Sequence, residues 1–360
     1  MHPTARRLAI SALATAGAML PASHGAEAVT PATIPRLAVP RLAVPRPAVH
    51  RAADSAAEQR TVKKFWTAAR MKTARPLDIP RAGDRYFTAG AEPAAGTTSA
   101  RPATVAPTRT TPTTTSRTTA TSTAVSSRTS GSSWAAGGTV ATTTGRVFFT
   151  VASGPDAGRS ASCSGTAVTS ANKSVVITAG HCVKLNGVFH ANWVFVPGYD
   201  KGNRPYGTWP ATTLLTTAQW NSGENMDYDI AAAVVAPQNG KSLTDVVGGQ
   251  GVAFNQPRGR QTYAFGYPAG APYDGSTLVY CSGRTFDDSF SSRDQGLSCG
   301  MTGGSSGGPW FMGFDTRTGT GLLNSVNSFK YTFAPYWMFG PYFGPEAEAV
   351  YNAAQKTALT

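Results

Sequence analysis

Short apolar or β-branched runs recur from about residue 145 to the end of the chain, and turns rich in Gly, Pro, Asn and Asp separate them. This punctuation is typical of strands in an all-β domain. The number and spacing of the runs favour a β-sandwich or a β-barrel. The clearest runs lie at 147–151, 166–168, 175–178, 193–196, 230–235, 262–265, 278–280 and 322–326.

The strand pattern breaks once inside this region and changes near its end. Gly and Pro interrupt it over 237–250, so we expect two halves, at about 145–240 and 250–343, to join there. Beyond 345 the apolar residues return at helical spacing, which predicts a C-terminal helix over about 345–357. These residues are Ala347, Val350, Tyr351 and Ala354.

The region before residue 97 contains a repeat and one helical pattern. Residues 35–49 carry a proline at every fifth position, which excludes a helix or a central strand and predicts an extended segment. Over 54–77, Val62, Trp66 and Met71 recur among basic residues, predicting one short amphipathic helix that ends before Pro76. We assign 29–96 as a basic pro-region.

A Ser- and Thr-rich tract follows the pro-region. From 97 to 133, 22 of 37 residues are Ser or Thr. Such a composition cannot bury enough apolar surface to offset the chain entropy lost on folding. We therefore expect a largely disordered leader, with a flexible linker over 97–144 ahead of the folded domain at 145–360.

The beginning of the chain has the pattern of a secretory signal peptide. Arg6 and Arg7 precede an uncharged stretch at 8–20, and small residues follow as far as Ala28, so we expect a signal peptide over 1–28. The uncharged stretch is too short to span a bilayer, which takes about 20 residues. These features predict an exported, extracellular protein with no membrane insertion.

Charge separates the leader from the predicted folded domain. Residues 1–146 contain 19 Lys and Arg and 6 Asp and Glu, whereas residues 147–360 contain 13 of each. The whole net charge of +13 therefore lies in the leader and linker. Because phosphate binding requires a basic surface, we expect the folded domain to have no nucleic-acid partner.

The Gly- and Ser-rich stretch at 303–309 is a candidate nucleophile loop. Glycines lie on both sides of Ser306, where the backbone could approach a substrate and its N–H groups could converge on an oxyanion. A flexible turn is the alternative. The stretch also fits the Gly-x-Ser-x-Gly pattern of α/β-hydrolases, which need a histidine after the serine. None of the histidines, His2, His24, His50, His181 and His190, follows Ser306, so that fold is excluded.

Two further motifs stand upstream of Ser306. His181 lies in Thr-Ala-Gly-His-Cys (178–182), directly after an apolar run, and Asp229 lies in Asp-Ile-Ala (229–231), at the head of another. With Gly-Ser-Ser-Gly-Gly-Pro (304–309) they resemble the three signatures of trypsin/chymotrypsin-like serine peptidases, in the order typical of chymotrypsin. The similarity covers about 145–360 and is closest in character to the secreted bacterial members.

The resemblance implies a fold and a set of roles. The fold is two six-stranded antiparallel β-barrels with the catalytic residues in the cleft between them, followed by a C-terminal helix. Ser306 is the expected nucleophile, His181 the general base and Asp229 the group that orients the imidazole. Asp227 is a rival for the last role. The N–H groups of Gly304 and Ser306 are the expected oxyanion hole.

The resemblance also suggests residues on the substrate side. Ser325 resembles the family serine that supports the aspartate and lines the substrate strand, and Gly300 and Asn327 are further candidates for substrate contact. Gly300 stands where trypsin-type members carry an acid, so a preference for Lys or Arg is not expected. Ser305 replaces the aspartate that pairs with the new amino terminus in animal members. Arg146-Val147 resembles an activation cleavage site, but without the acid partner we interpret residues 147–151 as a first strand and expect maturation somewhere in the linker. His190 is expected at the surface.

All four cysteines lie in the predicted folded domain. An even count in an exported chain favours disulfides, and four cysteines allow three connectivities. The resemblance implies the sequential pairing, Cys163 with Cys182 and Cys281 with Cys299. Zinc bound by these cysteines and His181 is the competing interpretation, but no Cys-x-x-Cys spacing supports it, so we expect neither a metal nor another cofactor.

Together these features predict a secreted serine endopeptidase that is made as a precursor, works as a monomer and acts on protein or peptide substrates. Two alternatives stay open. One is a catalytically silent, protease-like protein that binds partners or the cell surface. The other is an esterase that uses the same three residues.

Overall fold

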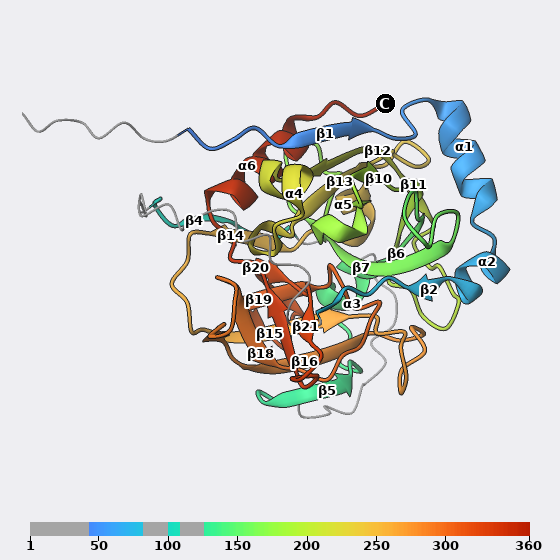
Figure 1. Ribbon diagram of the computed structural model, residues 1–360. Helices are drawn as coiled ribbons and strands as arrows, with labels where there is room; N and C mark the ends of the chain where they lie inside the picture. The colour runs from blue at the N-terminus through green and yellow to red at the C-terminus, as the bar shows by residue number, and fades with distance from the viewer. Residues whose placement is uncertain (1–42, 82–99, 109–125) are drawn as a thin grey trace, which may run out of the picture. The chain divides into compact units, whose positions relative to one another are not determined.

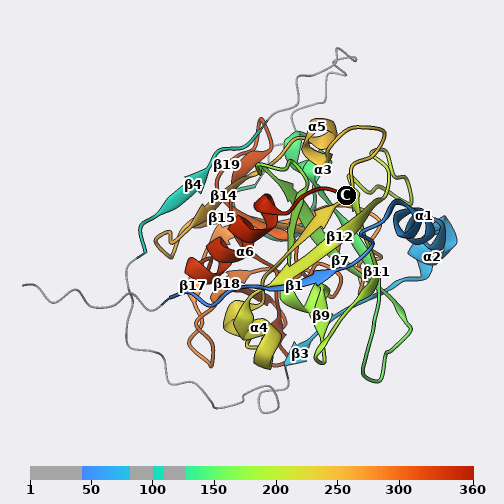
Figure 2. The ribbon, with the colours of Figure 1, turned by 90° about the horizontal axis from the view of Figure 1, so that it is seen from above.

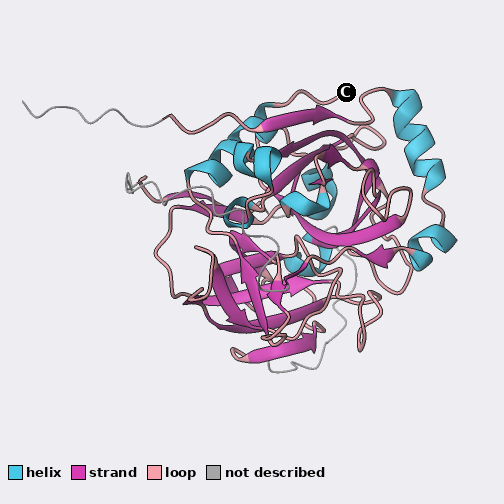
Figure 3. Cartoon of the chain, viewed as in Figure 1, coloured by secondary structure: helices cyan, strands magenta, loops and turns pink. Residues whose placement is uncertain are grey.

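Strands, nearly all of them paired antiparallel, are the main regular elements of the described chain, with a few short helices around them (Figure 3). The computed structural model describes residues 43–81, 100–108 and 126–360. The signal peptide expected at 1–28 lies outside the described residues, as do the first part of the repeat at 35–42 and the centre of the Ser/Thr-rich tract at 109–125.

The first half of the domain is a closed six-stranded antiparallel barrel. Its ladder runs β12-β11-β6-β7-β8-β13, and β13 pairs back onto β12 to close it. The apolar runs predicted as strands fill its interior, where Phe148 and Phe149, for example, are fully buried. This confirms the expected all-β class. The strands are β6 (Thr144–Thr150), β7 (Ser160–Val168), β8 (Val175–Thr178), β11 (Ala191–Pro197), β12 (Trp209–Thr216) and β13 (Ala231–Val235).

The second half lies below the first in Figure 1 and is built from two sheets. In the larger one the order β14-β20-β19-β15-β16 includes one parallel pair, β14 with β20. The smaller one has the order β17-β18-β22. The strands are β14 (Gly251–Phe254), β15 (Gln261–Gly266), β16 (Val279–Arg284), β17 (Phe286–Asp287), β18 (Gln295–Ser298), β19 (Pro309–Asp315), β20 (Thr320–Val326) and β22 (Trp337–Gly340).

Side chains rather than a continuous hydrogen-bond ladder join the two sheets of the second half. The disulfide between Cys281 on β16 and Cys299, just after β18, links them directly. Around it, Leu297, Trp310 and Met338 belong to one buried apolar cluster. This half therefore differs from a six-stranded antiparallel ladder in its pairing, although its core lies between strands as expected.

Part of the segment at 29–96, which was expected to be a pro-region, packs on the first barrel. In place of the single helix expected over 54–77, the structure has α1 (Ala56–Phe65) and α2 (Ala68–Thr73). Trp66, between them, is buried, donates from Nε1 to the carbonyl of Asn192 at 2.5 Å and lies against Phe148. Figure 1 shows both helices beside the barrel strands. The helical pattern is therefore interrupted because one aromatic side chain docks on the barrel.

Short strands from the leader add to edges of the folded domain. β1 (Ala48–Arg51) pairs with β12, β2 (Arg75–Pro76) with β7, and β3 (Pro80–Arg81) with β21 (Lys330–Tyr331). In the Ser/Thr-rich tract, β4 (Ala103–Val105) pairs with β14, as Figure 2 shows, and β5 (Thr129–Ser133) pairs with β16. A strand added to an existing edge gains backbone hydrogen bonds without apolar side chains, so composition alone did not predict these segments.

The remaining elements connect or cover the sheets. The C-terminal helix α6 (Pro345–Lys356) buries the apolar residues that predicted it, and α5 (Leu243–Val247) lies in the expected join between the halves. The described residues include no helix long and apolar enough to cross a membrane. The others are α3 (Thr139–Thr143), η1 (Gly180–Cys182), β9 (Lys184–Leu185), β10 (Val188–Phe189), α4 (Ala218–Gly223) and η2 (Met226–Tyr228).

Candidate active site

The pairing of β8 with β13 brings His181 and Asp229 together. These strands are antiparallel, with Thr178 at the end of β8 opposite Ala231 at the start of β13. The residues that follow β8 and those that precede β13 must therefore meet at one edge of the barrel. Gly180 permits the close approach, because a Cβ there would lie 2.8 Å from Asp229 Oδ1.

Asp229 binds His181 through both of its carboxylate oxygens. The backbone N–H of His181 donates to Oδ1 and ring atom Nδ1 lies against Oδ2, each at 2.8 Å, and both side chains are fully buried. An ionised carboxylate only accepts hydrogen bonds, so Nδ1 carries the proton and Nε2 of the neutral ring keeps a lone pair. Nε2 is buried and has no hydrogen-bond partner among the described residues.

A serine completes the shell of donors around Asp229. Ser328 Oγ donates to Asp229 Oδ2 at 2.5 Å. Ser325 was expected to support the aspartate, but Ser325 Oγ donates to the carbonyl of Pro341 instead. The two serines lie three residues apart, and β20 ends at Val326, so the chain leaves the sheet before it reaches the aspartate.

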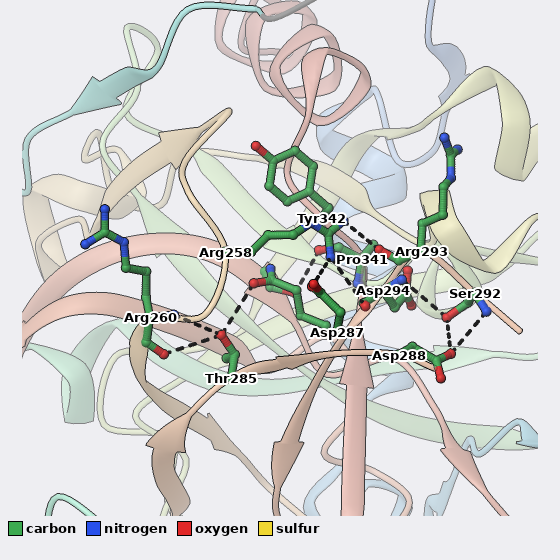
Figure 4. A network of polar contacts seen from close by, with 12 residues as sticks. Arg258, Arg260, Thr285, Asp287, Asp288, Ser292, Arg293, Asp294, Pro341 and Tyr342 are labelled. Atoms are coloured by element: carbon green, nitrogen blue, oxygen red, sulfur yellow. Dashed lines mark hydrogen bonds and ion pairs between the residues drawn. The ribbon is translucent and has the colours of Figure 1, made fainter. Parts of the chain in front are cut away.

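Asp227, the rival acid, faces a different partner. Its carboxylate accepts the backbone N–H of Arg293 at 2.8 Å and Arg293 Nε at 3.0 Å. Figure 4 shows Arg293 next to Ser292, which donates to Asp288. Asp227 therefore anchors the loop between β17 and β18, and of the two acids only Asp229 contacts the imidazole.

Ser306 lies in the loop before β19, and this loop docks on the first barrel. Ser164 on β7 donates from its backbone N–H to the carbonyl of Ser306 at 2.7 Å and from Oγ to the carbonyl of Gly304 at 2.9 Å. The carbonyl of Ser164 in turn accepts Thr178 Oγ1 at 2.8 Å. The serine loop and the histidine loop are thus held by neighbouring residues of β7 and β8.

Asn327 holds the serine loop from inside the protein. Its Nδ2 donates to the carbonyls of Ser305 at 3.0 Å and Phe265 at 2.9 Å, and its Oδ1 accepts Trp310 Nε1 at 2.7 Å. The side chain is fully buried. Asn327 was expected to contact substrate, but its polar atoms are committed to the loop. Gly300, the other candidate, does line a cavity of about 350 Å³ beside the loop.

Three backbone N–H groups in the loop have no acceptor in the described structure: those of Gly303, Gly304 and Ser306. Gly304 has φ +91°, and a Cβ there would lie 3.0 Å from the carbonyl oxygen of Tyr267. Only glycine takes up this conformation and this space without strain. These N–H groups are therefore available to an oxygen of a bound ligand.

His181 Nε2 has no hydrogen-bond partner among the described residues, so no hydrogen bond joins it to Ser306 Oγ. Catalytic hydrogen bonds are often long before a substrate binds. The site is also shielded: the His181 side chain is fully buried and Ser306 is only 4 % exposed. A hydroxyl that reacts with a peptide must be reached from solvent, so the segment of the chain that shields Ser306 also limits access to it.

Residues 77–81 of the pro-region cover the site. The backbone N–H of Leu77 donates to the carbonyl of Ser162 on β7 at 3.0 Å. The side chain of Ile79 is buried in the same cluster as Trp220 and Phe329, and the Trp220 ring lies 6.4 Å from that of His181.

His190 is not at the surface as expected. It is 2 % exposed, stacks on Phe149 and lies with Nε2 3.0 Å from the carbonyl of His181. Burial lowers the pKa of His190 to about 4, so the ring is neutral near pH 7 and donates from Nε2 to that carbonyl. His190 is buried because it stacks on Phe149 and binds the carbonyl of His181, and the sequence around His190 does not predict either contact.

The cysteines form two disulfides, Cys163 with Cys182 and Cys281 with Cys299. The sulfur atoms of the first pair lie within 4.8 Å of a ring nitrogen of His181. Zinc is bound by thiolates, and sulfur atoms joined in a disulfide do not supply them. The first disulfide instead ties β7 to η1, which carries His181.

Comparisons with known proteins place this architecture. No family model matches the chain, and no curated protein matches its sequence. Among solved structures, the protease Anisep from Arthrobacter nicotinovorans is 43 % identical, with a TM-score of 0.58, and the match covers 63 % of this chain and all of that one. The thermostable serine protease AL20 from an extremophilic microorganism is also 43 % identical, with a TM-score of 0.57, over 61 % of this chain and all of that one.

Proposed function

The chain belongs to the chymotrypsin-like serine peptidases of bacterial type, and from that premise we propose that it is an exported endopeptidase whose catalytic residues are Ser306, His181 and Asp229. The observation that carries this assignment is the double contact between Asp229 and His181, which occupies Nδ1 and leaves Nε2 as the ring nitrogen that can accept a proton. The loop that carries a serine between glycines is held by Ser164, whose carbonyl accepts Thr178 Oγ1 just before the histidine loop.

The proposed reaction follows from these groups. Ser306 Oγ attacks the peptide carbonyl carbon while His181 Nε2 takes the hydroxyl proton. The N–H groups of Gly304 and Ser306 stabilise the oxyanion. The C–N bond then breaks, the amine leaves with the proton from His181, and an acyl-enzyme on Ser306 remains. Water then attacks the carbonyl carbon of the acyl-enzyme while His181 Nε2 takes its proton. The ester bond breaks, Ser306 Oγ receives the proton, and the carboxylic acid is released.

Asp229 keeps the imidazole in one tautomer and stabilises the imidazolium that forms in each step. Ser328 and the backbone N–H of His181 compensate the buried carboxylate charge. Because all three contacts are made before substrate arrives, the pair is preorganised for the proton transfer.

We also propose that the full chain is a latent precursor. The covering of the site by residues 77–81 supports this, since a substrate needs the surface that Leu77 and Ile79 occupy. The signal peptide expected at 1–28 and the two disulfides support export to an oxidising compartment.

Peptide hydrolysis tests the triad. Asp229→Asn is expected to lower kcat by about 10⁴-fold. When the amide oxygen accepts the backbone N–H of His181, the amide NH₂ group faces Nδ1, which must then accept a hydrogen bond. The ring proton therefore moves to Nε2, and the imidazole is held in the wrong tautomer. Asp227→Asn is the matched control, since that acid contacts Arg293 instead. Equal losses in both variants, or a fully active Asp229→Asn, would rule out the assignment of Asp229.

A further inference from the structure

The cavity beside the serine loop is lined by a basic side chain. It opens between the segment that leads to Ser306 and the segment that follows Ser328. Its volume is about 350 Å³, enough for one extended side chain. It is lined by Asp78, Gly300, Thr302, Lys330, Tyr331, Thr332 and Pro335.

Lys330 is the one basic side chain among these lining residues. Its Nζ donates to the carbonyl of Cys299 at 2.7 Å and to that of Pro335 at 2.5 Å. An ammonium group has three donors, so one N–H remains for a ligand. Burial lowers the pKa of Lys330 to about 8, which leaves the group largely protonated at neutral pH.

Two of the neutral polar groups around the cavity already have acceptors. Thr302 Oγ1 donates to the carbonyl of Gly270 at 2.6 Å, and the Tyr331 hydroxyl donates to Asp288 at 2.6 Å. Gly300 contributes no side chain at all. Lys330 is therefore the positive group that a bound side chain meets in this cavity.

The chain itself presents an acid to this cavity. Asp78, from the covering segment, is exposed and lies at the rim. A Cβ at Gly303 would lie 2.9 Å from the Cβ and Oδ2 of Asp78, so the carboxylate rests against the backbone next to Gly304. Its charge stabilises the protonated form of Lys330, although the two groups form no direct ion pair.

We propose that this cavity receives the side chain on the acyl side of the scissile bond, and that Lys330 makes the peptidase selective for Asp or Glu at that position. The inference rests on the proposed function. A carboxylate that enters the cavity exchanges water for the free N–H of a fixed ammonium, whereas a basic side chain meets a like charge. In the precursor, Asp78 occupies the entrance to the same cavity.

The test uses the full-length chain and matched quenched peptides that differ only at the residue before the scissile bond: Glu, Gln, Asp, Asn, Lys or Leu. Rates are divided by the fraction of chains that a neutral fluorophosphonate labels at Ser306. The wild type is expected to favour Glu over Gln and Asp over Asn by roughly 10- to 100-fold in kcat/KM. Equal kcat/KM for the acid and its amide would overturn the inference.

Substitutions at Lys330 assign the preference to this residue. Lys330→Met is expected to remove it, Lys330→Arg to keep it, and Lys330→Glu to shift it toward Lys, with each rate again divided by the fraction of chains labelled at Ser306. The control is Lys241→Met, at an exposed lysine in a turn. A Lys330→Met enzyme that keeps the acid preference contradicts the proposal even if wild type shows it. A folded Ile79→Asp chain, in which the covering segment is displaced from the site, that neither labels nor cleaves refutes the peptidase function itself.

Discussion

Asp229 accepts two hydrogen bonds from His181, one from the backbone N–H and one from Nδ1, both at 2.8 Å. The first fixes the loop and the second fixes the ring, so one carboxylate sets both the position and the tautomer of the base. The following predictions test this arrangement and the elements that support it.

Ser328→Ala is expected to lower kcat roughly tenfold, because Asp229 loses a donor worth about 1.5–3 kcal/mol when its acceptor is charged. KM for a neutral peptide should change little, since Ser328 acts through Asp229. Ser325→Ala provides the comparison: it removes a hydrogen bond to Pro341 but none to Asp229. A larger fall in kcat for Ser325→Ala than for Ser328→Ala would contradict the assignment of the supporting serine.

Gly180→Ala is expected to reduce both activity and stability. The added Cβ would lie 2.8 Å from Asp229 Oδ1 and from ring atoms of Trp220, and relief of such overpacking typically costs about 1–3 kcal/mol. Chemical denaturation measures the free energy of unfolding and peptide hydrolysis measures kcat. Gly223→Ala is the control, since nothing lies within 4 Å of a Cβ there. Equal, negligible effects at both glycines would show that the close approach is unimportant.

His190 predicts a pH dependence of stability. Burial lowers the pKa of His190 to about 4, against an ordinary value of 6.5, so the unfolded chain binds more protons between these values. The stabilisation is complete above pH 6.5 and is lost as pH falls toward 4, by about 3 kcal/mol at most. His190→Gln keeps a donor for the carbonyl of His181 and should lose less stability over this range. Parallel pH profiles for the two proteins would exclude the effect.

Ile79→Asp is expected to open the site of the full-length chain. The buried Ile79 side chain lies with Trp220 and Phe329, and burying an unpaired carboxylate there is unfavourable. The initial rate of Ser306 labelling should rise by roughly 10- to 100-fold. Each factor of ten corresponds to a loss of about 1.4 kcal/mol in the stability of the covered conformation relative to the open one. Val49→Asp, at a residue of β1 that is 60 % exposed, should leave the rate unchanged. A rate that does not respond to Ile79→Asp would argue against latency.

Much of the domain was predictable because its signals are local. The run at 175–178 is β8 residue for residue, and the helix over about 345–357 was visible from apolar spacing alone. By contrast, β12 contains four Thr or Pro residues and is buried along its whole length. Its apolar and polar residues do not alternate, so the sequence did not predict a strand there. Its burial comes from partners on both sides, which sequence periodicity does not report.

The missed features of the site depend on contacts between distant residues. Ser325 and Ser328 are equivalent in the sequence Asn-Ser-Val-Asn-Ser, and only the end of β20 decides which of them reaches Asp229. Likewise, the pro-region segment at 77–81 had no local strand pattern, since its order comes from β7, β21 and a pocket for Ile79. Lys330 has no motif around it in the sequence, and its position depends on the carbonyls of Cys299 and Pro335, which accept hydrogen bonds from its Nζ.

The most direct test of the account is the site of covalent modification by a neutral fluorophosphonate, located by mass spectrometry of proteolytic fragments of the full-length chain. We predict one added phosphonyl group, on Ser306 and not on the adjacent Ser305, in wild type. We predict its loss in Ser306→Ala and at least a thousandfold slower addition in His181→Ala, since the unassisted hydroxyl is a poor nucleophile. A folded Ile79→Asp chain that never reacts, or one that reacts equally well without His181, would contradict the central claim.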